Sequence, residues 1–271
     1  MSYAKYNEDN VSIYINRLND KTSHPNSNIL ESKKEICEEL KKGENKMSEN
    51  YMYDMPKTLP VILLLDNSGS MAGNDKIDIL NNSVNTMLQS FRKLDSVIAT
   101  ISVSIITFGY EAKKVSELLP ANETQDIKLT ANGGTPFGRA LQIAKEMIED
   151  KENFPSRSYR PAVIAVSDGL PNDSWEAPLE AFKNTGRSSK CQCMAMSIGA
   201  PEGTEAFDVL ARFAGGNENV YFADSSKDIF RFFKFVTATI KTRTESSNPN
   251  IVPQLDIASI PDEGDDDDIL Y

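Results

Sequence analysis

The 271-residue sequence has few of the side chains that carry histidine or thiolate chemistry. It contains one histidine, His24, and three cysteines, Cys37, Cys191 and Cys193. A single histidine in a weakly patterned region argues against a Ser–His–Asp triad. Three cysteines, an odd number, do not form a disulfide framework and favour a reducing compartment. Cys191 and Cys193 are separated by one residue, which is the spacing of two strand residues on one face rather than of a CxxC motif.

Long apolar segments are also missing. No stretch approaches the roughly 20 apolar residues of a transmembrane helix. The first thirty residues hold no apolar segment of the kind found in signal peptides. We therefore expect a cytoplasmic protein that does not enter a membrane. The formal net charge of −11 argues against nucleic acid as the main partner.

Positive charge is absent from the C-terminal segment. Residues 244–271 contain eight acidic residues and no Lys or Arg, which leaves 32 acids against 29 bases in the rest of the chain. Together with Pro249, Pro253 and Pro261, these acids predict a disordered tail over 244–271. The alternative for its last three residues, Ile269-Leu270-Tyr271, is a short docking peptide.

Residues 1–57 are polar and lack a regular apolar pattern, which predicts a flexible or loosely docked extension. Met47, Met52 and Met55 precede the first strong strand pattern. Translation that begins at one of these methionines is therefore an alternative, in which residues 1–46 are not part of the protein.

Residues 58–243 alternate between apolar runs and helical patterns. The runs at 59–65, 103–108, 162–166, 191–198 and 220–222 predict strands, and 112–116 predicts a strand that forms a hairpin with 103–108. Helical patterns lie between them at 74–94, after 135, after 173, at 204–213 and after 225. This order predicts an α/β fold of the Rossmann-like, doubly wound type, with a mostly parallel central sheet and helices on both faces.

Three helix starts carry capping signals. Thr135 followed by Pro136 is typical of an N-cap and the first helical position. Asp173, with Glu176 three residues later, predicts a capping box for the helix that follows. Ser225 with Asp228 predicts the same arrangement for the last helix.

The chemistry of the chain is centred on the end of the first strand. Five apolar residues, 61–65, lead directly into Asp66-Asn67-Ser68-Gly69-Ser70. Taken alone, this stretch is equally typical of a helix cap with turn residues. Thr135 and Asp168 supply two further oxygen side chains, one before a predicted helix and one after a predicted strand. In a parallel sheet these loops can lie on one edge, where open α/β sheets place their binding sites.

Asp66, Ser68, Ser70, Thr135 and Asp168 together offer two carboxylates and three hydroxyl groups. These hard oxygen ligands suit Mg²⁺ or Mn²⁺ and disfavour zinc, which prefers histidine and cysteine. The sequence therefore predicts a divalent-metal site built from these five residues.

The five positions resemble the metal-ion-dependent adhesion site (MIDAS) of von Willebrand factor A (VWA) domains, which has the pattern DxSxS, then a threonine, then an aspartate. The resemblance covers about residues 59–243. It implies that Ser68, Ser70 and Thr135 reach the metal directly or through water, while Asp66 and Asp168 act mainly through water. It further implies a non-enzymatic module in which an Asp or Glu of a protein partner completes the metal's coordination.

Within VWA domains the sequence most resembles the bacterial tellurium-resistance (TerY-type) branch. That resemblance implies a cytoplasmic chemical-stress response, with a protein kinase and a metal-dependent serine/threonine phosphatase as partners. The segments that carry it are Leu59-Pro60-Val61, Asp66 to Met71, Ile106-Thr107-Phe108, Gly133-Gly134-Thr135 and Phe232 to Val236.

The alternative function is a metal-dependent phosphatase or hydrolase with Asp66 as the nucleophile. Phosphatases of this type usually carry a second acid two residues later, which acts as general acid. Ser68 occupies that position here, so the sequence favours a metal-site role for Asp66.

Overall fold

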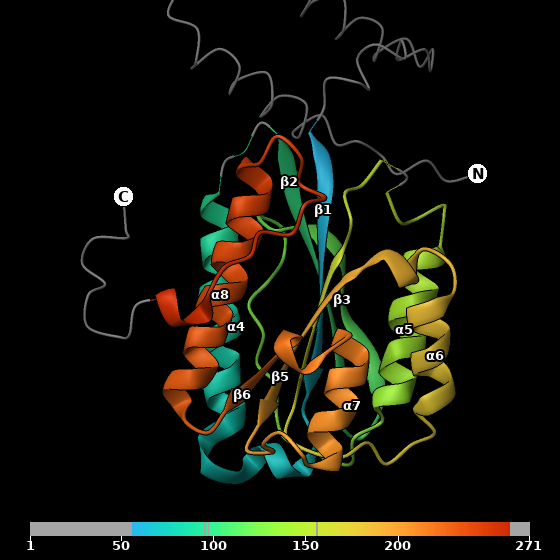
Figure 1. The fold of residues 1–271 in the computed structure, drawn as a ribbon, viewed down its shortest axis with the longest axis vertical. Coiled ribbons are helices and arrows are strands. Elements are labelled where there is room, and N and C mark those ends of the chain that lie inside the picture. The colour runs from blue at the N-terminus through green and yellow to red at the C-terminus, as the bar shows by residue number, and fades with distance from the viewer. Residues whose placement is uncertain (1–55, 95, 97, 156, 261–271) are drawn as a thin grey trace, which may run out of the picture. The chain divides into compact units, whose positions relative to one another are not determined.

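The computed structural model describes residues 56–94, 96, 98–155 and 157–260. Its centre is a six-stranded sheet with the order β3-β2-β1-β4-β5-β6 (Figure 1). All neighbouring strands are parallel except β2 and β3, which are antiparallel. The predicted mostly parallel α/β sheet is therefore confirmed. The strands are β1 (Lys57–Asp66), β2 (Ala99–Phe108), β3 (Ala112–Pro120), β4 (Ala162–Ser167), β5 (Gln192–Ile198) and β6 (Val220–Ala223).

Helices cover both faces of the sheet (Figure 1). Helices α4 and α8 pack on one face, and α5, α6 and α7 pack on the other. None of the helices in the described ranges is long and apolar enough to cross a membrane. The helices are α4 (Lys76–Lys93), α5 (Phe137–Glu149), α6 (Glu176–Asn184), α7 (Glu205–Ala214) and α8 (Ser226–Glu245), with short 3-10 turns η1 (Gly69–Asp75), η2 (Ser188–Lys190), η3 (Asn217–Asn219) and η4 (Ile257–Ser259).

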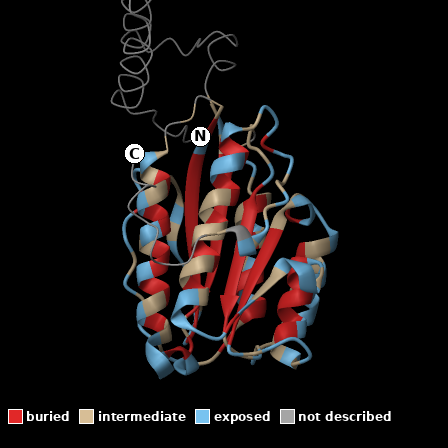
Figure 2. Cartoon of the chain, turned by 60° about the vertical axis from the view of Figure 1, so that its left-hand side comes forward, coloured by how far each residue is buried: buried red, intermediate tan, exposed pale blue. Residues whose placement is uncertain are grey.

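Strand β1 lies between β2 and β4 and is the most enclosed element of the sheet. Its last eight residues are buried, as the red strands of Figure 2 illustrate. Leu63 and Leu65 pack toward α4 and α8, whereas Ile62 and Leu64 pack toward α5, α6 and α7. Because alternate residues face opposite sides of a sheet, a strand covered on both faces must be apolar throughout. The uninterrupted run before Asp66 follows from this position.

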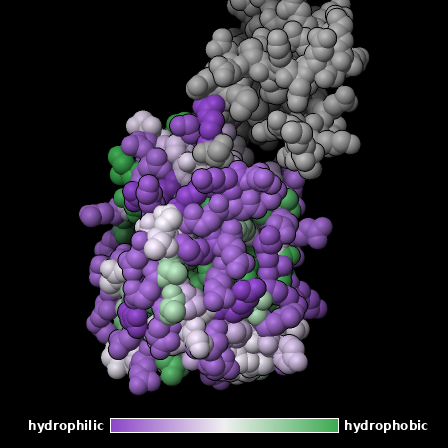
Figure 3. Space-filling model, turned by 90° about the vertical axis from the view of Figure 1, so that its right-hand side faces the viewer, coloured by the Kyte–Doolittle hydropathy of each residue, from purple (hydrophilic) through white to green (hydrophobic). Residues whose placement is uncertain are grey.

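The apolar sides of the helices are turned inward. The face of the molecule drawn in Figure 3 is mostly hydrophilic, and its apolar residues form only small scattered areas among the described residues. Cys193 is buried in the cluster beneath α5, α6 and α7, and Cys191 packs against the same cluster. The predicted sharing of one face by these two cysteines is confirmed, and both are free thiols.

Two of the predicted helix caps are wrong. Helix α5 begins at Phe137 and Thr135 does not cap it. Asp173 does not cap α6 either, since its carboxylate accepts hydrogen bonds from the backbone N–H of Gly138 (3.0 Å) and Arg139 (2.8 Å), at the start of α5. Because Asp173 of a distant loop caps α5, the Thr135 side chain is available to the predicted site. The capping box of Ser225 and Asp228 at α8 is confirmed.

The chain beyond residue 243 contacts the domain, where the sequence predicts a tail. Helix α8 continues to residue 245, and Arg243 is wholly buried within it. The Arg243 guanidinium donates hydrogen bonds to the carbonyl oxygens of Pro249 (2.8 Å) and Arg160 (2.5 Å). Asn250 accepts one from the Arg160 backbone N–H (2.7 Å). Residues 244–260 therefore differ from the predicted disorder, while 261–271 and the N-terminal residues 1–55 lie outside the described ranges.

Candidate metal centre

Asp66 ends strand β1 and is wholly buried. One of its carboxylate oxygens, Oδ1, accepts a hydrogen bond from the Ser68 backbone N–H (2.7 Å). The other, Oδ2, accepts one from the hydroxyl of Ser167 (2.5 Å), the last residue of the neighbouring strand β4. The carboxylate is thus fixed by its own loop and by the next strand. Sequence reasoning did not identify Ser167, because its role depends on the pairing of β1 with β4.

The two serines of the first loop point toward Asp168. Ser68 Oγ lies 2.9 Å from Ser70 Oγ, and Ser70 donates a hydrogen bond to Asp168 Oδ1 (2.6 Å). Asp168 follows strand β4, so this contact joins the ends of two parallel strands. The predicted convergence of Ser68, Ser70 and Asp168 on one edge of the sheet is present in the structure.

Thr135 reaches the same place from the loop before α5. A Cβ atom built on Gly169 would lie 3.9 Å from Thr135 Oγ1 and 4.0 Å from Ser70 Oγ, so the three loops meet there. The backbone of Thr135 is held by Asn172, whose Oδ1 accepts from Thr135 N–H (3.0 Å) and whose N–H donates to Thr135 O (3.2 Å). We infer that Asn172 positions Thr135, a role that the sequence pattern did not reveal.

A cation of the chain itself contacts the site. Lys76 Nζ lies 2.7 Å from Asp168 Oδ2, and the Asp168 side chain is only 1% exposed. Lys76 is the first residue of α4, where the helix dipole favours acids over bases. A lysine at the unfavourable N-terminal position of a helix is a sequence signal that would have indicated an acidic partner for Lys76. The ammonium group shows that this edge of the sheet accommodates positive charge.

The donor set fits a divalent cation. Burial raises the pKa of Asp66 to about 6, against the lowering effect of its hydrogen bonds with Ser167 and Ser68. A buried carboxylate of this kind gains from a nearby positive charge. Within the described ranges no three His, Cys, Asp or Glu residues are grouped as a metal site. Any metal here therefore depends on the hydroxyl groups of Ser68, Ser70 and Thr135 as well as on the two carboxylates.

Residues 61–170 match the family model of the von Willebrand factor type A domain, and this stretch holds all five predicted site residues. Over this stretch the chain is similar to VWA domains. No match was found among curated proteins. The TerY-type branch consequently stays a prediction from the sequence.

Solved structures share the VWA fold at low sequence identity. The pilus adhesin SpaC from Lactobacillus rhamnosus GG is 15% identical, with a TM-score of 0.57 over 69% of this chain and 30% of its own. A von Willebrand factor type A protein from Catenulispora acidiphila is 20% identical, with a TM-score of 0.52 over 68% of this chain and 42% of its own.

Proximal thread matrix protein 1 from the mussel byssus, in a structure with a zinc-occupied MIDAS motif, is 18% identical. Its TM-score is 0.51 over 70% of this chain and 46% of its own. The chain thus spans less than half the length of each of these three structures. At these identities the likeness shows the fold of the VWA domain.

Proposed function

We propose that residues 58–243 form a VWA domain and that this domain is a metal-dependent protein-binding module. Asp66, Ser68, Ser70, Thr135 and Asp168 would hold Mg²⁺ or Mn²⁺, as a MIDAS. The observation that carries this proposal is the meeting of three loops, with two carboxylates and three hydroxyl groups, at one edge of the sheet. When bound, the metal supplies a Lewis-acid position for an incoming ligand. Because three of the donors are neutral hydroxyl groups, the metal's charge stays incompletely balanced, which favours an Asp or Glu of a protein partner.

The comparisons support the general class of function that we propose. One structural neighbour is described as a pilus adhesin, and another has a zinc-occupied MIDAS. Through its resemblance to the TerY-type branch, we further propose that this domain acts in a cytoplasmic tellurium-resistance or chemical-stress response. Its partners there would be a protein kinase and a metal-dependent serine/threonine phosphatase, rather than nucleic acid or a membrane.

Titration calorimetry with Mg²⁺ and Mn²⁺ tests the metal site. We expect saturable binding by the wild type, its loss in Asp66→Ala, and unchanged binding in Asp208→Ala, which removes an exposed acid of α7 far along the chain. Equal binding by the wild type and Asp66→Ala would refute the site. Partner binding is tested by a pull-down with and without Mg²⁺, in which Thr135→Ala should lose the metal-dependent partners.

The geometry weighs against the phosphatase alternative. A nucleophilic Asp66 must present its carboxylate to a substrate, but that side chain is wholly buried and both its oxygens accept hydrogen bonds. Ser68 stands where a general acid is needed. Steady hydrolysis of p-nitrophenyl phosphate that Asp66→Ala abolishes would reverse this assignment.

A further inference from the structure

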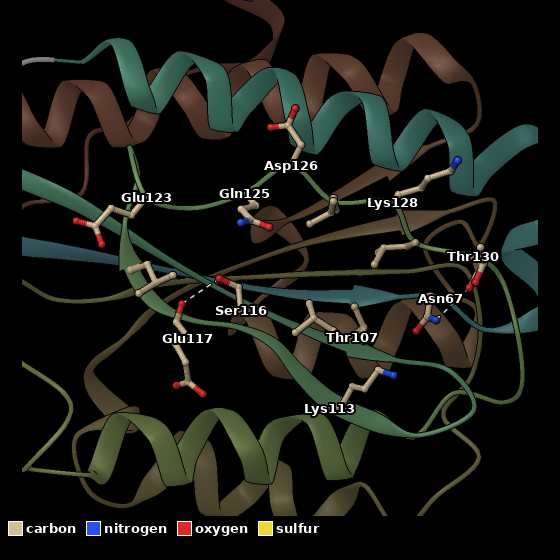
Figure 4. Close-up of a pocket in the computed structure, with 14 residues that line it drawn as sticks. Asn67, Thr107, Lys113, Ser116, Glu117, Glu123, Gln125, Asp126, Lys128 and Thr130 are labelled. Atoms are coloured by element: carbon tan, nitrogen blue, oxygen red, sulfur yellow. Dashed lines mark hydrogen bonds between the residues drawn. The ribbon is translucent and has the colours of Figure 1, made fainter.

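A groove lies next to the metal centre, between strand β3 and the chain segment 123–130 (Figure 4). Its volume is about 610 Å³, within the roughly 300–1,000 Å³ of ligand-binding pockets. One of its lining residues is Asn67, which stands between Asp66 and Ser68 in the DxSxS motif. One end of the groove therefore adjoins the loop that carries Asp66 and Ser68.

The segment above the groove is held like a strand, but by side chains of a helix. Asn85 accepts a hydrogen bond from Ile127 N–H (2.8 Å) and donates one to Ile127 O (2.9 Å). Asn81, one turn earlier on α4, does the same for Leu129 (2.7 and 2.9 Å). The two asparagine amides thus take the place of a neighbouring strand. Because Ile127 and Leu129 also pack against the core, the segment is fixed in its orientation.

The backbone edge of residues 126–130 that points away from α4 carries several groups that are unpaired among the described residues. In an extended chain, the backbone groups of successive residues point to opposite sides. Since those of Ile127 and Leu129 point to α4, those of Asp126 and Lys128 point away from it. Neither the N–H nor the C=O of Asp126 or Lys128 forms a hydrogen bond with any described residue. Only the carbonyl of Thr130, nearest the metal centre, is paired, with Asn67 Nδ2 (3.1 Å).

The charges along the groove differ between its two ends. Lys128 lies toward Asn67 and the metal centre, and Glu123 lies at the far end (Figure 4). Neither forms an ion pair within the described part of the chain. The other charged lining residues are paired within the chain: Lys113 with Glu111, Glu117 with Lys114, and Asp126 with Arg92.

We propose that this groove binds an extended peptide of a partner protein, which adds as a strand to the edge formed by residues 126–130. The unpaired backbone groups supply the hydrogen bonds of strand addition. The charges select the peptide: an acidic side chain at the metal end, near Lys128, and a basic side chain at the far end, near Glu123. The choice of an acidic residue rests on the proposed function, because its carboxylate is the group that would bind the metal. Strand pairing does not depend on the metal.

Two capped heptapeptides test the proposal, because the direction of the added strand is open. Each alternates threonine and valine between a terminal aspartate and a terminal arginine, one in each order. They are titrated into the full ¹⁵N-labelled chain, with Mg²⁺ and with EDTA. We expect one of them to shift the amide signals of Asp126 and Lys128, more tightly with Mg²⁺ than with EDTA.

The decisive comparison is Lys128→Pro against Lys128→Ala. Both lose the charge, but only proline loses the N–H donor, and because that N–H has no partner among the described residues, its removal breaks no hydrogen bond there. Loss of one strand hydrogen bond should weaken the peptide by about tenfold relative to Lys128→Ala. Mg²⁺ calorimetry on both variants confirms that the metal site is intact.

The outcomes separate the two proposals. Equal peptide affinity of Lys128→Pro and Lys128→Ala, or no binding of either peptide to a chain that binds Mg²⁺, overturns strand addition. Peptide binding that Lys128→Pro weakens but that Mg²⁺ does not affect supports the groove and counts against the metal bridge. Signal changes confined to β6, an edge strand of the sheet, also overturn the proposal.

Discussion

At the scale of single residues, the buried charge of Asp66 lowers the stability of the folded chain, and a bound metal would offset this effect. The carboxylate is wholly buried, and burial raises its pKa from 3.8 to about 6. Between these two values the folded chain holds a proton that the unfolded chain has released. Stability contributed by this group therefore falls as the pH rises from about 4 to about 6, by about 3 kcal/mol in total. Above that range the ionised, metal-free site is at its least favourable.

Asp66→Asn tests this cost. In EDTA at neutral pH we expect the variant to be more stable than the wild type by about 1–2 kcal/mol, because no buried charge has to be formed. In Mg²⁺ only the wild type should gain stability. Urea unfolding at pH 4.5 and 7.5 measures both effects. Destabilisation of the variant in EDTA at pH 7.5 would contradict the argument, and the difference should vanish near pH 4.

Lys76 is expected to compete with the metal for Asp168. Lys76→Gln removes the ammonium group from Asp168 Oδ2. We expect Mg²⁺ to bind about tenfold more tightly to the variant, since like charges in one site repel. The metal-free variant should be less stable, because the buried Asp168 carboxylate loses its ion pair and keeps only the hydrogen bond from Ser70 among the described residues. Calorimetry against Lys93→Gln, an exposed lysine at the other end of α4, measures the effect. Weaker Mg²⁺ binding by Lys76→Gln would show instead that Lys76 supports the site.

At the scale of elements, local patterns predicted structure well where the cause is local. The run of apolar residues predicted β1 because both of its faces are covered by helices. The capping box of Ser225 and Asp228 was predictable because both residues belong to the same turn. Asp173 has the same spacing to Glu176 but caps α5, since the fold brings the loop after β4 to the start of that helix. Spacing along the chain contains no information about such a contact.

Asp173→Ala distinguishes these two interpretations. We expect a loss of about 1 kcal/mol of stability, the usual cost of a removed cap. Hydrogen exchange should accelerate at the amides of Gly138 and Arg139, which donate to Asp173. Exchange in α6, at Leu179 for example, should change little. Faster exchange in α6 with α5 unaffected would restore the cap that the sequence predicts.

At the scale of the whole molecule, the alternation of strands and helices and the edge that carries the site were predictable. Alternating strands and helices place Asp66, Thr135 and Asp168 on loops of one edge, and the structure brings them together. The groove was not predictable. It depends on Asn81 and Asn85 holding residues 48 and 42 positions further along the chain. Neither an asparagine pair on a helix nor a polar connecting segment has a pattern that indicates this pairing.

The C-terminal boundary of the domain depends on Arg243. Its guanidinium is wholly buried and its described partners are neutral: the carbonyls of Pro249 and Arg160 and the side chain of Gln192. Burial without a carboxylate lowers the pKa of Arg243 to about 10. The residue thus joins α8, the start of β5 and the segment after residue 245. A domain that ended at residue 243 would lose the Pro249 acceptor and expose this charge.

Arg243→Met is expected to destabilise the domain by about 2–4 kcal/mol, because it removes the donor from the carbonyl groups of Pro249, a buried residue, and of Arg160. Lys241→Met, an exposed substitution two residues away on the same helix, should change stability by less than about 0.5 kcal/mol. Urea unfolding of both variants, together with protease sensitivity near Asn250, measures the difference. If the segment after residue 245 is only a tail, Arg243→Met will not change its proteolysis. If it completes the domain, cleavage there will rise with the loss of stability, while Mg²⁺ binding at the distant edge of β1 stays intact in the folded fraction.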